Sequence, residues 1–172
     1  MRGTLGLLLT ACLLTTTTLA AGPKVTLVVS PQAPALEQTA ASELADLLRR
    51  MYDAEVTTAS SLPTNGSAII ALGSPATNPV LKPLANEWPR LSDQGHVLKS
   101  VKLGSTPVLV VGGGSPVATL WGAYELGHQW GARYLLQGDE LPDEPAPLRV
   151  DGFNQTWEPR SEEHTSELQS QF

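Results

Sequence analysis

One apolar stripe constrains the fold of this chain more than any other feature of its sequence. From Leu36 onward the apolar residues recur at helical spacing, at positions 36, 40, 44, 47, 48 and 51. Glu43, Asp46, Arg49 and Arg50 fall on the other side of the same helix, where Asp46 can pair with Arg50 four residues on. A helix with one apolar stripe must lie on another apolar surface, so the chain needs a second layer.

Several short segments supply strands for that layer. Residues 24–29 (K-V-T-L-V-V) form a β-branched run that ends at Ser30-Pro31, and residues 55–58 favour a further short strand. Residues 68–73 (A-I-I-A-L-G) are apolar on both faces, which predicts a central strand. Residues 95–103 and 107–111 predict a hairpin joined by Gly104-Ser105-Thr106. A last strand is expected over residues 132–136.

The second helix has clear start and stop signals. Ser115 can cap its N-terminus and Pro116 suits its first position, while Gly131 can supply a left-handed residue after Trp130. A strand–helix–strand unit makes a right-handed crossover with parallel strands, and the hairpin adds an antiparallel pair. The order predicts an α/β (α+β) two-layer sandwich: a mixed β-sheet of five or six strands with two main helices packed on it.

The N-terminal residues have the pattern of a secretory signal peptide. A basic residue, Arg2, precedes an apolar run over residues 5–14, and small residues follow at Thr18, Ala20 and Ala21. The run is too short and too rich in threonine for a membrane-spanning helix. We expect residues 1–21 to be the signal peptide and the product to be secreted or periplasmic. The alternative is a lipoprotein, because L-T-A-C over residues 9–12 resembles a lipobox that would acylate Cys12.

The C-terminal tail has a different origin. Residues 160–170 read R-S-E-E-H-T-S-E-L-Q-S, which resembles the in-frame translation of a common short-read sequencing adapter. We therefore interpret residues 160–172 as an adapter-derived artefact that is not part of the folded domain. The natural polypeptide is expected to be cut near Pro159, with residues 22–150 as one domain and residues 151–159 as the start of a linker.

Charge and cysteine content exclude some partners. Without Arg160, Glu162, Glu163 and Glu167 the acids number 14 and the bases 10, so the net charge is −4 rather than −6. No basic patch is visible, which argues against nucleic acid as a partner. The single cysteine lies in the signal-like segment, so no disulfide is expected in the domain.

The best local signal for a binding site is the glycine turn before the second helix. Gly112 and Gly114 match part of the dinucleotide fingerprint, but Val117 stands where the third glycine belongs, and a phosphate-binding loop would need a lysine. Glycines ahead of a helix N-terminus can cradle an anion. The simpler interpretation is a tight turn that lets the helix fold back on the sheet.

The titratable residues do not form a catalytic or metal-binding pattern. Glu125 and His128 have the spacing of half a carboxylate-bridged metal site, but the second half is missing, and His96 and His128 are expected to be surface or hydrogen-bonded histidines. The acidic pairs 139–140 and 143–144 are expected to be solvated charges in a proline-rich loop, where nothing would raise a pKa. We assign no catalytic residue, cofactor or metal.

The serines and the tryptophans are the remaining candidate site residues. Ser30, Ser74 and Ser115 each precede proline, and no Gly-x-Ser-x-Gly elbow is present. The tryptophans could form a sugar-stacking platform, but we favour packing in the core or against a neighbouring domain. They lie at Trp88, Trp121, Trp130 and Trp157.

A family resemblance adds what the residues alone do not give. The run T-L-W-G-A-Y-E-L-G-H-Q-W-G-A-R-Y-L-L-Q-G-D-E-L-P, over residues 119–142, resembles a signature that closes the N-terminal accessory domain of bacterial glycoside hydrolases. Residues 40–56 and 68–73 are similar to the first helix and the inner strand of that domain. The domain precedes the barrel in family 67 α-glucuronidases and family 20 β-N-acetylhexosaminidases. The resemblance covers residues 24–150, apart from the polar loop 57–67 and the three glycines 112–114.

The resemblance implies a non-catalytic role. In such families the carboxylates that cleave the glycosidic bond belong to a following (β/α)8 barrel, and this domain supports it. The expected partner is that barrel of the same, longer chain, and carbohydrate is met only through it. Two alternatives stay open: a free-standing periplasmic module that binds an anion or nucleotide, and a lipid-anchored interaction protein.

Overall fold

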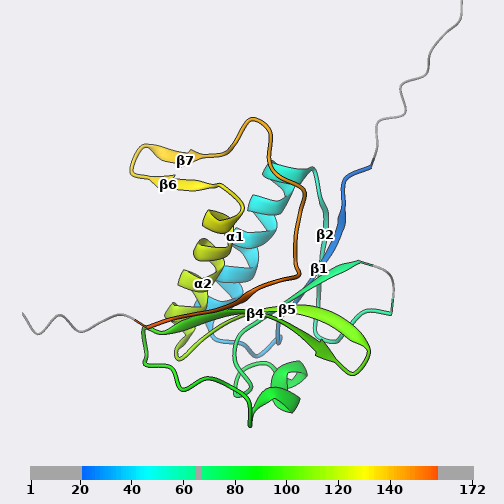
Figure 1. Cartoon of the computed structure of the whole chain (residues 1–172), viewed down its shortest axis with the longest axis vertical. Helices are drawn as coiled ribbons and strands as arrows, with labels where there is room; N and C mark the ends of the chain where they lie inside the picture. The colour runs from blue at the N-terminus through cyan, green and yellow to red at the C-terminus, as the bar shows by residue number, and fades with distance from the viewer. Residues whose placement is uncertain (1–20, 65–66, 159–172) are drawn as a thin grey trace, which may run out of the picture.

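The computed structural model describes residues 21–64 and 67–158, which form a six-stranded mixed sheet with two main helices on one face (Figure 1). The signal-like residues 1–20 and the adapter-like tail lie outside the described residues. This architecture confirms the predicted two-layer sandwich. The sheet order is β2-β1-β3-β5-β4-β8. The bounds are β1 Lys24–Val28, α1 Ala35–Tyr52, β2 Glu55–Ala59, β3 Ala68–Leu72, η1 Pro79–Leu84, β4 His96–Leu103, β5 Thr106–Gly113, α2 Pro116–Gln129, β6 Arg133–Leu135, β7 Gly138–Glu140 and β8 Asn154–Trp157.

The sheet has a parallel part and an antiparallel part. β1 pairs in parallel with both β2 and β3, and β3 pairs in parallel with β5. β4 runs antiparallel to β5 and to β8. The β1–α1–β2 unit therefore connects parallel strands, as predicted. The β4–β5 connection is shorter than expected, because Thr106 already belongs to β5 and only Gly104 and Ser105 lie between the strands.

The predicted caps of α2 are present. The Ala118 backbone N–H donates to the Ser115 hydroxyl at 3.3 Å, which satisfies one free donor of the first turn. Gly131 has a φ of 105°, and the Ala132 N–H donates to the Gly127 carbonyl at 3.0 Å. This is the Schellman motif, which ends a helix through a left-handed residue that glycine adopts without strain.

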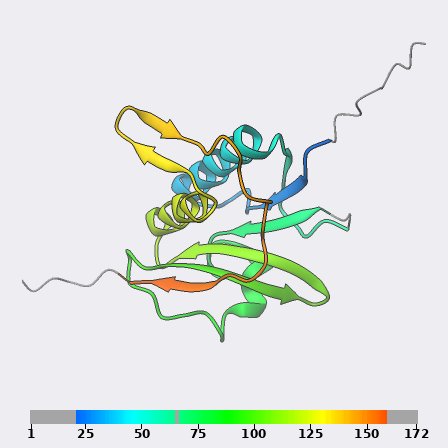
Figure 2. The same cartoon turned by 45° about the horizontal axis from the view of Figure 1, so that its top comes forward.

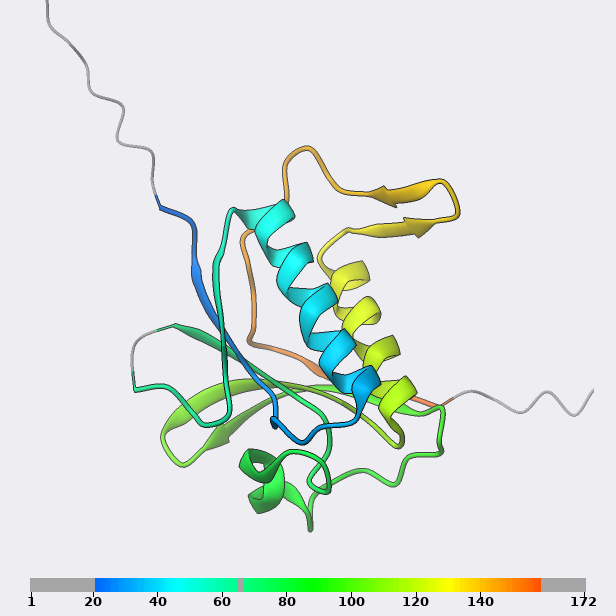
Figure 3. The same cartoon turned by 180° about the vertical axis from the view of Figure 1, so that it is seen from behind.

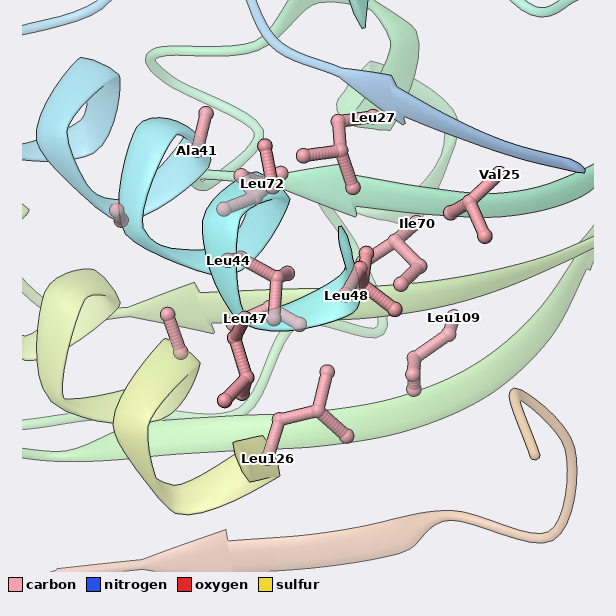
Figure 4. Packing of buried hydrophobic residues seen from close by; sticks show 14 of the residues in the cluster. Val25, Leu27, Ala41, Leu44, Leu47, Leu48, Ile70, Leu72, Leu109 and Leu126 are labelled. Atoms are coloured by element: carbon pink, nitrogen blue, oxygen red, sulfur yellow. The ribbon is translucent and has the colours of Figure 1, made fainter. Parts of the chain in front are cut away.

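The helices and the sheet enclose the main core. Leu44 and Leu48 of α1 are 1% and 0% exposed and lie among Ile70, Leu72 and Leu109 of the sheet (Figure 4). The prediction for one end of the apolar stripe was wrong. Leu36 is 42% exposed, and the neighbouring Glu37 is 1% exposed instead. The buried face runs through positions 37, 41, 44 and 48, so a carboxylate, not a leucine, begins it.

A second, smaller cluster covers the other face of the sheet. Val28, Ile69, Ala71, Val108 and Val110 are buried there. Leu81 of η1 packs over them and is 0% exposed; Figure 3 shows η1 on the side of the sheet opposite the two helices. β3 contributes side chains to both clusters, which confirms it as the central strand predicted from its apolar faces.

The last strands differ from expectation. β6 forms where a strand was predicted, but it pairs with β7 in a separate two-stranded hairpin that projects from the helix layer (Figure 2). Residues 154–157, which the sequence analysis placed in the passage to a following unit, form β8 at the edge of the main sheet. A short strand has no periodicity that reveals its partner, so the sequence could not place either one.

Side-chain contacts fix the base of the β6–β7 hairpin on the helices. Arg50 of α1 pairs with Asp139 of β7 at 2.8 Å. The Tyr134 ring lies 4.9 Å from the Tyr124 ring, and its hydroxyl packs against Gly127, where a side chain would collide with it. Burial, helped by the Asp139 charge, raises the pKa of Tyr134 to about 12. The base of the hairpin is therefore held in place on the helices, and its tip projects beyond them.

Candidate functional site

The carboxyl ends of three parallel strands define the candidate site. In open α/β sheets, ligands bind outside these ends, where helix N-termini also gather. Here β1 leads to Ser30, β3 leads to Gly73 and Ser74, and β5 ends in the glycine turn before Ser115. Both α1 and α2 begin at this edge. This location is suitable for an anion. Whether an anion can bind depends on whether protein atoms already fill the space at the strand ends.

Neighbouring atoms fill the space beside all three glycines. A Cβ at Gly112 would meet the Gly73 carbonyl oxygen and lie 2.6 Å from the Trp88 ring, and one at Gly113 would lie 2.5 Å from the Thr119 nitrogen. A Cβ at Gly114 would meet the Ser92 carbonyl oxygen. Such approaches require glycine. The glycine turn, which links β5 to α2, is thus closely packed against α2 and against residues 88–92.

Two backbone donors at this turn are also used. The Gly114 N–H donates to the Gly95 carbonyl at 2.9 Å, and the Ala118 N–H donates to the Ser115 hydroxyl at 3.3 Å. An anion site needs free donors that point at the ligand. The structure therefore favours the tight-turn interpretation of the glycines over the anion-binding one.

A buried carboxyl group, which the sequence analysis missed, lies at the same edge. The Thr77 hydroxyl donates to Glu37 Oε1 at 2.9 Å, and Glu37 Oε2 has no hydrogen-bond partner among the described residues. Burial raises the pKa of Glu37, and the hydroxyls of Thr77 and Thr119 oppose that shift. Thr119 donates to the Ser115 carbonyl at 3.3 Å, so Thr77 is the main partner of the carboxyl group. The spacing 37, 41, 44, 48 was the signal that could have found it.

We expect Glu37 to make the stability of the domain depend on pH. Its pKa is raised in the folded state, so its contribution to the free energy of unfolding is full below the unfolded pKa and is lost as pH rises through the folded pKa. Glu37→Gln keeps a neutral acceptor for Thr77 and should remove this dependence. We expect the urea midpoint of the variant to exceed that of the wild type by a margin that grows from pH 4 to pH 8. Glu43→Gln, on the exposed face of α1, is the matched control; equal pH profiles for wild type and Glu37→Gln would refute the assignment.

An open groove lies next to the glycine turn. It has a volume of about 300 Å³ and is lined by Ser74, Trp88, Leu91, Gly113 and Gly114, among others. The Ser74 hydroxyl lies 3.3 Å from the Thr77 hydroxyl, and the Ser74 backbone N–H donates to the Thr77 hydroxyl. Both interactions stabilise the turn at residues 74–77. Glu37 is sealed behind this turn and is not available to a substrate.

The candidate histidines do not meet. His128 Nδ1 lies 4.0 Å from Glu125 Oε2, and Gln129 donates to the other oxygen of that carboxylate at 2.7 Å. His96 stacks on Trp157, with ring centroids 5.0 Å apart and an interplanar angle of 14°. Burial lowers the pKa of His96, and the Gln94 backbone and the charges of Glu125 and Glu158 oppose the shift. Neither ring nitrogen of His96 makes a hydrogen bond of normal geometry to a described residue, so the expectation of a satisfied histidine was wrong.

The acidic pairs and the remaining serines have local roles. Asp139 and Glu140 lie in β7 rather than in an open loop, and Asp139 pairs with Arg50. Residues 143 and 144 are exposed in the following loop. Ser115 caps α2, and the Ser30 hydroxyl accepts the Gln32 N–H at 3.2 Å. Over the described ranges, no three His, Cys, Asp or Glu side chains gather as metal ligands.

The tryptophans pack separately. Trp130 is 7% exposed, meets Tyr52 edge-on at 5.9 Å and donates to the Arg149 carbonyl at 3.1 Å. Trp157 stacks on His96, and Trp88 lies against Gly112. Trp121 is 41% exposed. They do not form a common stacking platform, in agreement with the packing interpretation.

Of the helices in the described part, none combines the length and apolarity needed to cross a bilayer.

Comparison with known proteins gives the class and then the family. The sandwich fold and the motifs on α1, β3 and α2 define an N-terminal accessory domain of glycoside hydrolases. The chain belongs to the family described as glycosyl hydrolase family 67 N-terminus, whose model matches residues 15–126. This match confirms the resemblance stated from the sequence.

The chain also resembles solved structures, of which one is a glucuronidase. A family GH115 4-O-methyl-α-glucuronidase with specificity for decorated arabinogalactans is 17% identical, with a TM-score of 0.48. The similarity covers 63% of this chain but only 13% of that one. No curated protein matches the chain.

Proposed function

We propose that this chain is the non-catalytic N-terminal domain of a longer, secreted glycoside hydrolase of the α-glucuronidase or β-hexosaminidase kind that degrades polysaccharide. The observation that carries the proposal is the family match over residues 15–126, because that family is itself described as an N-terminus. Its role would be to support a following (β/α)8 catalytic barrel. Carbohydrate would then be bound only by that barrel.

The candidate site supports a structural role. Glycosidic bond cleavage generally uses two carboxyl groups that flank the bond, one to protonate the leaving oxygen. At the strand ends, Glu37 is enclosed by packing and the glycine turn is filled by its neighbours. The residues at this edge of the sheet pack the strands and helices together, which is consistent with a supporting domain.

We expect the purified 21–158 segment to show no turnover of aryl glucuronides or aryl N-acetylglucosaminides above the uncatalysed rate. The complete natural gene should continue beyond codon 158 with several hundred codons patterned as alternating strands and helices, and its product should turn over one of these substrates. Glycosidases accelerate hydrolysis by many orders of magnitude, so the two results are easily separated. Turnover by the short segment, or a gene that stops soon after codon 158, would contradict the proposal.

Export is part of the proposal. Its support is the basic, apolar and small-residue order over residues 1–21, which lies outside the described residues. Mass spectrometry of the mature protein should find an N-terminus after Ala20 or Ala21. An acyl group on Cys12, lost on Cys12→Ser, would instead support the lipid-anchored alternative.

A further inference from the structure

In the described part of the chain, four of the five large apolar side chains that remain exposed lie on α2 and on the β6–β7 hairpin that packs against it. In the described part of the chain these are Trp121, Tyr134, Leu135 and Leu136, with Leu36 the exception; Leu136 is 104% exposed and Leu135 is 46% exposed. Tyr124 joins them, since it lies one turn from Trp121 on α2 and its ring contacts the Tyr134 ring at 4.9 Å. We call Trp121, Tyr124, Tyr134, Leu135 and Leu136 the apolar strip.

The strip belongs to ordered elements. The hairpin that carries Leu135 and Leu136 is fixed by the Arg50–Asp139 pair and by the Tyr134 hydroxyl against Gly127. Its two leucines are therefore held outward at a set position. Contiguous exposed apolar side chains on a rigid element are a feature of interaction sites, whereas single exposed residues are common and need no explanation.

The chain leaves the domain on the same side. The described residues end at Glu158, whose carboxylate accepts the Ser92 N–H at 2.9 Å, directly after Trp157 stacks on His96. The charges of Glu125 on α2 and of Glu158 both act on His96, so this exit lies close to α2. The hairpin tip and the exit lie on the same side of the molecule in all three views (Figures 1, 2 and 3).

We propose that the apolar strip is the surface against which the domain that follows Glu158 packs. The inference rests on the proposed function, because it needs a following domain. The position of the exit favours this occupant over a second copy of the chain, since a domain tethered at Glu158 reaches the strip at high effective concentration. A membrane is disfavoured because Asp139, Glu140, Asp143 and Glu144 follow the hairpin tip and would be repelled by anionic lipids.

The test compares the 172-residue chain with the product of the complete gene by hydroxyl-radical footprinting. We expect Trp121, Tyr134 and Leu136 to be oxidised several-fold more slowly in the longer protein, whereas Leu84 of η1, which packs on the other face of the sheet, is unchanged. Leu135→Asp and Leu136→Asp should lower the Tm of the longer protein by about 5 °C or more, but should shift that of the short chain by no more than about 2 °C. Lys82→Asp, at an exposed position of η1 on the other face of the sheet, is the control and should have little effect in either protein.

Each contrary outcome has a distinct meaning. Equal oxidation rates in a longer protein that is an active glycosidase would overturn the docking surface and leave the proposed function standing. A gene without a following domain would overturn both. Protection in the short chain that depends on its concentration would identify a second copy as the occupant, and binding to phosphatidylserine vesicles would identify a membrane; either result would overturn the inference.

Discussion

Leu44→Ala is expected to lower the free energy of unfolding by about 2–5 kcal/mol. Leu44 is 1% exposed and lies in the main core that α1, α2 and the sheet share. Removal of the side chain reduces the buried apolar area and leaves a cavity. The cavity persists because α1 packs against both α2 and the sheet and cannot move far enough to fill it. Urea unfolding followed by far-ultraviolet circular dichroism measures the change.

Leu36→Ala provides the internal comparison for this prediction. It removes the same atoms from the same helix, but at a position that is 42% exposed. The expected change is within about 0.5 kcal/mol, as for most surface substitutions. Equal losses in the two variants would show that α1 packs through a different face from the one described.

Gly113→Ala should destabilise the domain by about 1–3 kcal/mol although it adds only one methyl group. The new Cβ would lie 2.5 Å from the Thr119 nitrogen and 2.7 Å from the Ala118 carbonyl carbon. Both are backbone atoms of the first turn of α2, so the helix as a whole must move away from β5. Thermal and urea unfolding should both report the loss.

Gly122→Ala, one turn further along α2, is the matched control. Its nearest new neighbour is the Val111 Cγ1 atom at 3.3 Å, which belongs to a side chain that can shift. Alanine also has the higher helix propensity, by about 1 kcal/mol, which offsets the tight contact. We expect Gly122→Ala to be nearly neutral. A Gly113→Ala variant as stable as Gly122→Ala would mean that β5 and α2 are less closely packed than the structure shows.

The elements that the sequence predicted well are those with long patterns or specific end signals. The stripe on α1 extends over about four turns, and Ser115, Pro116 and Gly131 mark both ends of α2. The apolar run 68–73 could only be a central strand, and it is one. Each of these features depends on neighbours in sequence, which periodicity and capping preferences describe directly.

The features that the sequence did not predict depend on distant parts of the chain. Glu37 is buried beside Thr77, which lies forty residues further along the chain and donates a hydrogen bond to it. The glycine turn suggested close packing, but its neighbours come from Gly73, Trp88 and Ser92, and no local pattern relates these positions. The candidate site was thus located by its glycines, but the neighbours that fill the space beside those glycines could be identified only in the tertiary structure.

The place of β8 sets the boundary at which this domain can be expressed alone. A polypeptide that stopped at Val150 would lose the strand that pairs with β4 through residues 96–99. The outer N–H and C=O groups of β4 would then face solvent, and such bare strand edges promote pairing between molecules. His96 would also lose the Trp157 ring that covers it. A soluble fragment for crystallisation should therefore extend at least to Glu158.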